Sequence, residues 1–283
     1  MFYLVFTIIT STLIIIAFKL FPKYDINVIQ AITINYLVAS GFGFLSEPEP
    51  FHFHELHLQP WFPVSFLVGI TLIIGFNLFA LSARKTGVVI TAISSRMSVV
   101  IPVGLGFLIF SEKLTTIKLI GILMALSAFY MSFLKKQSMK PDIKFIFLPF
   151  LLFLALGVND SMMKFAQYYF IGDDFILFLS TSFFISLVLG ILVLLYKSGH
   201  EKWSIKNIAA GIIIGLLNWF STYYFLKGLD LFEVSMIVPV INVGIVALSS
   251  LAGYLFFTEK LRKINWVGIL VAMISIVLMS LSG

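Results

Sequence analysis

Two ionisable residues, Arg96 and Asp160, lie inside long apolar runs of the 283-residue sequence. Charged groups in such surroundings are costly and are therefore candidates for function. A guanidinium group cannot lose its proton, so Arg96 must find an anion, backbone carbonyl groups or water. A carboxyl group in a low-dielectric cavity can exchange protons. We therefore expect Arg96 to bind a carboxylate or phosphate, and Asp160 to couple to a proton or cation.

Each candidate also has a structural alternative. Lys164 lies four residues after Asp160 on the same helical face, which Gly157 and Gln167 extend. This spacing allows an internal ion pair between Asp160 and Lys164. Arg96 could instead pair with Asp160, but the helical rise of 1.5 Å per residue places the two about 10 Å apart in depth. The sequence leaves both alternatives open.

Helical phase separates Arg96 from the neighbouring hydroxyl groups. Thr91, Ser94, Ser95 and Ser98 share one face, and Arg96 points about 150° away from its centre at 100° per residue. A buried arginine needs water or an anion more than a serine does. We therefore expect Arg96 to face a cavity and the hydroxyl stripe to pack against a helix.

Other polar residues in the apolar runs mark inward-facing surfaces, although small and hydroxyl residues are also common contacts between membrane helices. Gly211 and Gly215 predict such a close contact. Pro102 and Pro239 each remove a backbone hydrogen bond, so they are candidates for gates or static bends. The predicted substrate-binding residues are Arg96, Asn77, Asn218, Thr222, Tyr223, Asn242, Thr7 and Ser11, and the predicted coupling residues are Asp160 and Lys164.

Membrane-spanning helices must position these side chains. Hydrophobic residues make up 60% of the chain and charged residues 11%, against roughly 25% charged in a soluble domain. A spanning helix needs roughly 20 apolar residues. We therefore predict an all-α integral membrane protein, whose first run is a span and not a cleaved signal peptide. The ten predicted transmembrane helices are 2–21, 26–46, 61–83, 87–110, 116–134, 144–170, 174–196, 205–227, 232–257 and 264–282.

The two halves of the chain resemble each other. Positions 110–125 match positions 257–272 at nine of sixteen residues, including Glu-Lys-Leu and a glycine seven residues later. We predict one five-helix repeat at 1–138 and a second at 139–283. Five is odd, so the second repeat is inverted, as in secondary transporters whose substrate site lies near the midplane. A duplication kept only for packing is the alternative.

The repeated Ser/Thr-Glu-Lys-Leu step, Ser111–Leu114 and Thr258–Leu261, resembles the drug/metabolite transporter superfamily, in particular its ten-helix EamA-type members. The resemblance implies a carrier for amino acids, sugars, nucleosides, phosphorylated metabolites or drugs, and does not fix the substrate. Glu112 and Glu259 match the family pattern, and we expect them to hold short interhelical turns. The chain departs from many relatives in lacking basic residues at its two ends.

Several other functions are disfavoured by the sequence. The chain has no cysteine, which excludes disulfides and thiolate chemistry. No histidine lies within a predicted span (His200 lies in a loop) and no phosphate-binding glycine motif is present, so we expect neither an enzyme nor a cofactor. The spacing of His52, His54 and His57 matches no strong zinc pattern, and a solvated loop is expected there. A non-transporting membrane scaffold or a lipid scramblase remains the alternative to a transporter.

Positive charge predicts the orientation. Of the 19 Lys and Arg residues, 14 lie in or beside the links that follow odd-numbered spans. These links should face the cytoplasm, which places both termini outside. The net charge of +6 fits this distribution better than nucleic-acid binding. We expect a monomer in a plasma membrane, as in a bacterial inner membrane, with lipids and a small-molecule substrate as partners.

Overall fold

The structure is a computed structural model that describes residues 2–86, 88–133, 145, 147–198, 203–257 and 263–280. Its described secondary structure is entirely helical. The α-helices are α1 (Phe2–Tyr24), α2 (Val28–Leu45), α3 (Phe62–Lys85), α4 (Val88–Met97), α5 (Val100–Leu108), α6 (Thr116–Phe133), α7 (Phe147–Tyr169), α8 (Phe175–Ser198), α9 (Ile205–Leu231), α10 (Val234–Phe257) and α11 (Lys263–Ser280). A short 3-10 helix, η1 (Phe53–Leu58), connects α2 to α3. The predicted boundary at 138/139, Glu259 and His200 lie outside the described residues.

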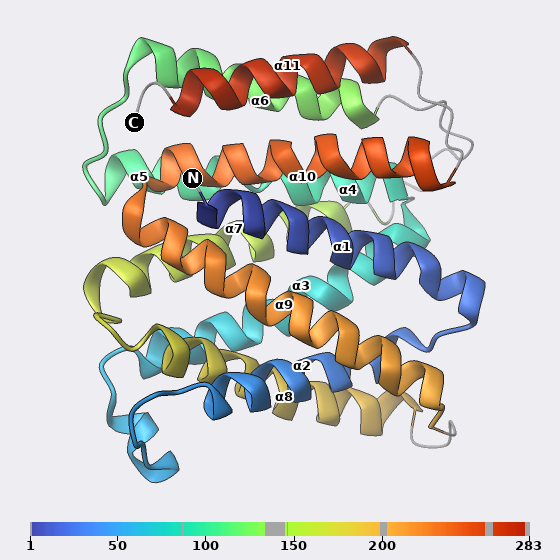
Figure 1. The fold of residues 1–283 in the computed structure, drawn as a ribbon, viewed down its shortest axis with the longest axis vertical. Helices are drawn as coiled ribbons and strands as arrows, with labels where there is room; N and C mark the ends of the chain where they lie inside the picture. The colour runs from blue at the N-terminus through green and yellow to red at the C-terminus, as the bar shows by residue number, and fades with distance from the viewer. Residues whose placement is uncertain are drawn as a thin grey trace.

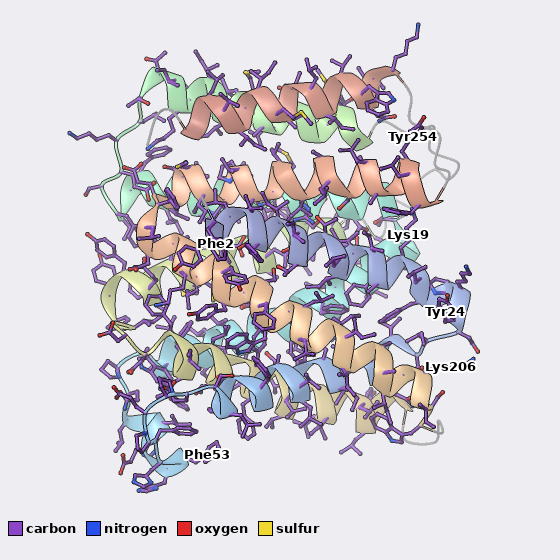
Figure 2. All side chains as sticks on the ribbon, viewed as in Figure 1. Phe2, Lys19, Tyr24, Phe53, Lys206 and Tyr254 are labelled. Atoms are coloured by element: carbon purple, nitrogen blue, oxygen red, sulfur yellow. The ribbon has the colours of Figure 1, made fainter. Side chains whose placement is uncertain are left out.

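The long helices form one layered bundle and run roughly side by side (Figure 1). One end, which we call the Phe53 end, carries η1 and the α5–α6, α7–α8 and α9–α10 turns. The opposite end, the Tyr24 end, carries Tyr24, Lys206 and Tyr254 (Figure 2). Among the described residues, α1, α2, α3, α7, α8, α9 and α10 are long and apolar enough to cross a membrane, which suggests a membrane-embedded protein.

The fourth predicted span is not one continuous helix. It divides into α4 and α5, with Ser98 and Val99 between them. Pro102 explains the break, because it has no N–H group for the Ser98 carbonyl and its ring crowds that carbonyl. The Ser98 carbonyl accepts from the Ile101 N–H instead, at 3.0 Å. Pro239, by contrast, lies inside the uninterrupted α10.

The first helix extends slightly beyond its predicted end at residue 21. α1 continues through Pro22 to Tyr24. Asp25 then adopts a positive φ of 53°, the left-handed conformation that commonly terminates helices.

Helix packing follows a regular pattern. α1 packs against α9 and α10, while α7 packs against α3 and the broken pair α4 and α5. α2 packs against α8 and α9, α8 also packs against α3, and α6 forms one outer layer with α11 (Figure 1). When the helices are paired by their order in the two halves, α1 with α7, α2 with α8, α3 with α9, α4–α5 with α10 and α6 with α11, exchanging the members of each pair reproduces most of these contacts.

The predicted close contact at Gly211 and Gly215 is confirmed. A Cβ atom at Gly211 would lie 2.7 Å from the Ala31 carbonyl oxygen, and one at Gly215 would lie 2.8 Å from the Asn35 carbonyl oxygen. Only glycine allows α9 to approach the α2 backbone this closely. The pair therefore fixes the α2–α9 contact.

The α9–α10 turn is held by side chains from the first half. The Glu112 carboxylate accepts the backbone N–H groups of Val234 and Ser235 at 2.8 and 3.0 Å, which caps the N-terminus of α10. Lys118, only 1% exposed, donates from its ammonium group to the Glu233 carboxylate. Glu112 thus lies in a short turn, as expected, and stabilises a helix in the other half.

Candidate functional site

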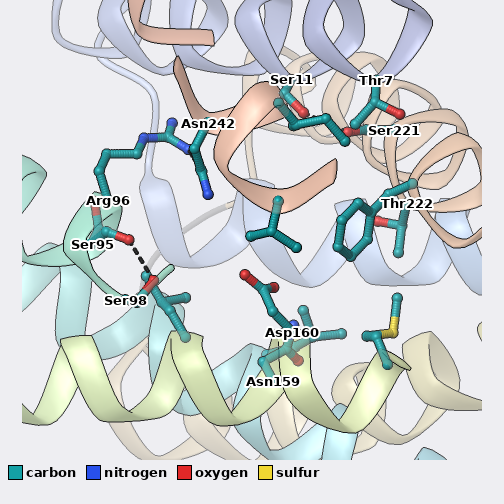
Figure 3. Close-up of a pocket in the computed structure, with 16 residues that line it drawn as sticks. Thr7, Ser11, Ser95, Arg96, Ser98, Asn159, Asp160, Ser221, Thr222 and Asn242 are labelled. Atoms are coloured by element: carbon teal, nitrogen blue, oxygen red, sulfur yellow. Dashed lines mark hydrogen bonds between the residues drawn. The ribbon is translucent and has the colours of Figure 1, made fainter. Parts of the chain in front are cut away.

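A cavity of about 210 Å³ lies between helices of both halves. α1, α3 and α4 contribute from the first half, and α7, α9 and α10 from the second (Figure 3). Its lining combines charged, amide and hydroxyl groups with apolar walls. The lining residues are Thr7, Ser11, Leu72, Ser95, Arg96, Ser98, Leu156, Asn159, Asp160, Met163, Ser221, Thr222, Phe225, Val238, Ile241 and Asn242.

Arg96 reaches the cavity from the last turn of α4, just before the helix break. Its Nη1 atom donates to Asn242 Oδ1 on α10 at 2.7 Å. Asp160 lies on the α7 wall of the same cavity, and the two opposite charges attract each other across it. Within the described part of the chain, Arg96 has no carboxylate oxygen within 4.0 Å. The alternative of an Arg96–Asp160 ion pair is therefore not formed in this structure.

Lys164 does not pair with Asp160 either. Its ammonium group donates to the Leu229 carbonyl at 2.7 Å and to Gln167 Oε1 at 2.8 Å. The carbonyl groups at a helix C-terminus attract a cation, and α9 ends at Leu231. Lys164 thus stabilises the end of α9, and Asp160 remains directed at the cavity (Figure 3).

Hydroxyl groups line the wall opposite α7. Ser11 on α1 and Ser221 on α9 share a hydrogen bond of 2.6 Å. Thr7 donates to the Tyr3 carbonyl at 2.8 Å, and Thr222 donates to the carbonyl four residues earlier at 2.9 Å. Because these two hydroxyl protons bond to the backbone, the Thr7 and Thr222 oxygens can accept hydrogen bonds from a bound solute.

The expectation that Arg96 and the hydroxyl stripe serve different neighbours is wrong for Ser95 and Ser98. Both line the cavity with Arg96, while Thr91 is buried and shares a 2.6 Å hydrogen bond with Ser82. Ser98 lies beyond the end of α4 at Met97 and so leaves the helical phase of that helix, while Ser95 lies only about 100° from Arg96 on α4. Ser98 donates to the Ser95 carbonyl at 2.7 Å in the irregular turn that follows (Figure 3).

Several predicted site residues lie elsewhere. Asn77 donates to the Ile73 carbonyl at 2.9 Å, Asn218 donates to Asn35 Oδ1 at 3.1 Å, and Tyr223 stacks on Trp219. The predicted residues that do line the cavity are Arg96, Asn242, Thr7, Ser11, Thr222 and Asp160, and those that do not are Asn77, Asn218, Tyr223, Lys164, Pro102 and Pro239.

Asn159 is a cavity residue that sequence reasoning missed. Its Oδ1 accepts from the Thr71 hydroxyl at 3.0 Å, and its amide interacts with the Asp160 carboxylate. Its position next to an intramembrane carboxylate was the available signal.

The histidines between α2 and α3 lie on the surface. The His54 side chain is 79% exposed and lies 3.5 Å from the Glu55 carboxylate. Among the described residues, no three His, Cys, Asp or Glu side chains converge as metal ligands.

Comparison with known proteins supports the fold and leaves the function open. The chain matches no family model. An uncharacterized protein of Haemophilus influenzae is 26% identical over 282 residues, covering 96% of this chain and 95% of its own. A protein of known crystal structure, 12% identical, superimposes with a TM-score of 0.83 over 99% of this chain and 96% of its own. The chain is thus similar over its whole length to a solved fold.

Proposed function

We propose that the chain is a secondary transporter that moves a small anionic or zwitterionic metabolite, such as an amino acid, by alternating access through the central cavity. The observation that carries the proposal is the cavity itself. Helices of both halves line it, and a guanidinium group and a carboxylate lie on different walls. Such a site binds a solute with a negative group at Arg96 and a positive group near Asp160. The apolar walls, formed by residues such as Leu72, Met163 and Phe225, can accept an apolar side chain.

The proposed architecture is ten spans in two inverted five-helix repeats, as in EamA-type members of the drug/metabolite transporter superfamily. The matching blocks at 110–125 and 257–272 support it, and so does the exchange symmetry of helix packing. The break between α4 and α5 lies beside the cavity, as discontinuous helices do at transporter substrate sites. Alternating access then follows from movement of one repeat against the other.

Asp160 is the proposed coupling residue, since its carboxylate faces the same cavity as the substrate. If the Asp160 carboxylate takes up a proton when substrate binds, or releases its proton when the ammonium group of the substrate binds, transport is linked to a proton gradient. The proposed location is a bacterial plasma membrane, with the lysine-rich Tyr24 end in the cytoplasm and both termini outside.

The test is counterflow into liposomes that contain the purified protein and a panel of unlabelled metabolites. We expect labelled zwitterionic or anionic metabolites to enter, and Arg96→Ala to abolish their entry in a folded protein. Arg96→Lys keeps the charge without the planar fork and should retain part of the flux. Absence of metabolite flux would contradict the proposal. Movement of labelled lipid between leaflets would indicate a scramblase, and no movement of either would indicate a scaffold.

A further inference from the structure

The hydrogen bond of Arg96 joins the two halves of the protein. Arg96 lies on α4, and its acceptor Asn242 lies on α10. α10 packs against α1, α11, α5 and α6 and not closely against α4, so Arg96 extends from its own helix to reach Asn242. At the sequence offset of 147, Asn242 occupies the position equivalent to Ser95, and both residues line the cavity.

Hydrogen-bond chemistry fixes which atom of Asn242 faces Arg96. A guanidinium group only donates, so the amide oxygen must face it and the amide NH₂ group must point away. The bond uses one N–H of Nη1. Among the described residues, no acceptor takes the other N–H groups of the fork, and two parallel ones are needed to hold a carboxylate or phosphate in bidentate fashion.

A neutral acceptor also preserves the charge of Arg96. A carboxylate in the place of Asn242 would hold the guanidinium group equally well but would cancel its charge. Asp160 lies on another wall and is not in ion-pair contact with Arg96. Arg96 is thus oriented by an uncharged group and keeps its attraction for an anion.

We propose that Asn242 is a positioning residue for anion binding: its amide oxygen holds the plane of the Arg96 guanidinium group so that the free N–H groups face the cavity. This inference rests on the proposed function. Because the acceptor belongs to the other half, the orientation holds only while α4 and α10 keep this relative position. Anion affinity therefore depends on the conformation of the transporter.

The test compares leucine, a zwitterion, with leucinamide, which lacks the carboxylate, by equilibrium binding to the purified protein. Asn242→Ala should weaken leucine binding about tenfold, the effect of losing one charge-assisted hydrogen bond. It should leave leucinamide binding unchanged. Asn242→Asp should weaken leucine binding more than Asn242→Ala, although it keeps an acceptor, because it neutralises Arg96. Asn265→Ala, which removes a buried amide on α11 outside the cavity, is the matched control and should behave as wild type.

Thermal unfolding without any solute tests the contact independently. Asn242→Asp should raise the melting temperature when Arg96 is present and lower it in an Arg96→Ala background. The inference is overturned if the two backgrounds respond alike, if Asn242→Ala binds leucine as wild type does, or if leucine and leucinamide lose affinity equally. Failure of wild type to bind leucine or any other anionic or zwitterionic metabolite of the panel would instead contradict the proposed function, whatever the unfolding result.

Discussion

Removing the Glu112 carboxylate should destabilise the protein through α10. Glu112 accepts two backbone N–H groups from the first turn of α10, at 2.8 and 3.0 Å. Loss of a helix N-cap costs roughly 0.5–2 kcal/mol, and hydrogen bonds to a charged group contribute roughly 1.5–3 kcal/mol. Water can replace part of this at a membrane surface. We therefore expect Glu112→Ala to lower the free energy of unfolding by about 1–3 kcal/mol. Glu112→Gln retains one acceptor oxygen and should cost about half as much.

Thermal unfolding in detergent measures this effect. A loss of 1 kcal/mol lowers the melting temperature by roughly 2–4 °C in a protein of this size class, so Glu112→Ala should lower the melting temperature by roughly 2–12 °C. Glu55→Gln is the matched control, because the Glu55 side chain is 52% exposed and, among the described residues, forms an ion pair only with the exposed His54 imidazole. Equal melting temperatures for Glu112→Ala and Glu55→Gln would refute the capping role.

Three further predictions concern packing, coupling and orientation. Gly215→Ala should destabilise the protein by roughly 1–3 kcal/mol in the same unfolding assay, because its Cβ would collide with an α2 carbonyl oxygen, whereas Gly41→Ala has open space and should be tolerated. Asp160→Asn should abolish pH-driven accumulation in proteoliposomes and leave exchange of an anionic solute, which has no positive group to bind Asp160, largely intact; unchanged accumulation would exclude Asp160 as the coupling residue. The chain has no cysteine, so single cysteines can report orientation. A cysteine in place of His54 should react with an impermeant maleimide added outside intact cells, and a cysteine in place of Tyr24 should not. The reverse result would show that the orientation is inverted.

Apolar run length was enough to locate the helices, because each run must satisfy its backbone inside one segment. The same approach could not locate the break at Ser98. A proline in an apolar run interrupts the helix at Pro102 and is accommodated at Pro239. Packing around each proline decides between these outcomes, and the sequence alone does not show that packing.

The charged residues of the candidate site could be predicted from the sequence. Arg96 and Asp160 stood out because an apolar run rarely contains an ionisable group, and both line the cavity. Amide residues were less predictable, since Asn218 and Asn242 look alike in sequence. Asn218 bonds to a neighbouring helix while Asn242 lines the cavity. The partners of such groups come from segments more than 100 residues away, which helical periodicity does not reveal.

Lys164 shows the same limit. Spacing of four residues allowed a pair with Asp160 as one alternative, yet the ammonium group binds the last turn of α9. A local spacing rule describes an isolated helix. Here the orphan carbonyl groups of a packed helix end compete for the cation, and their position depends on the fold.

The most direct test of the account is whether the central cavity opens to each side of the membrane in turn. A single cysteine at Thr222, which lines the cavity, can be probed with an impermeant thiol reagent in right-side-out and inside-out vesicles. The account predicts reaction from both sides and protection from both sides by a transported metabolite. Reaction from one side only, or reaction from both sides without protection by any metabolite of the panel, would contradict alternating access through this cavity.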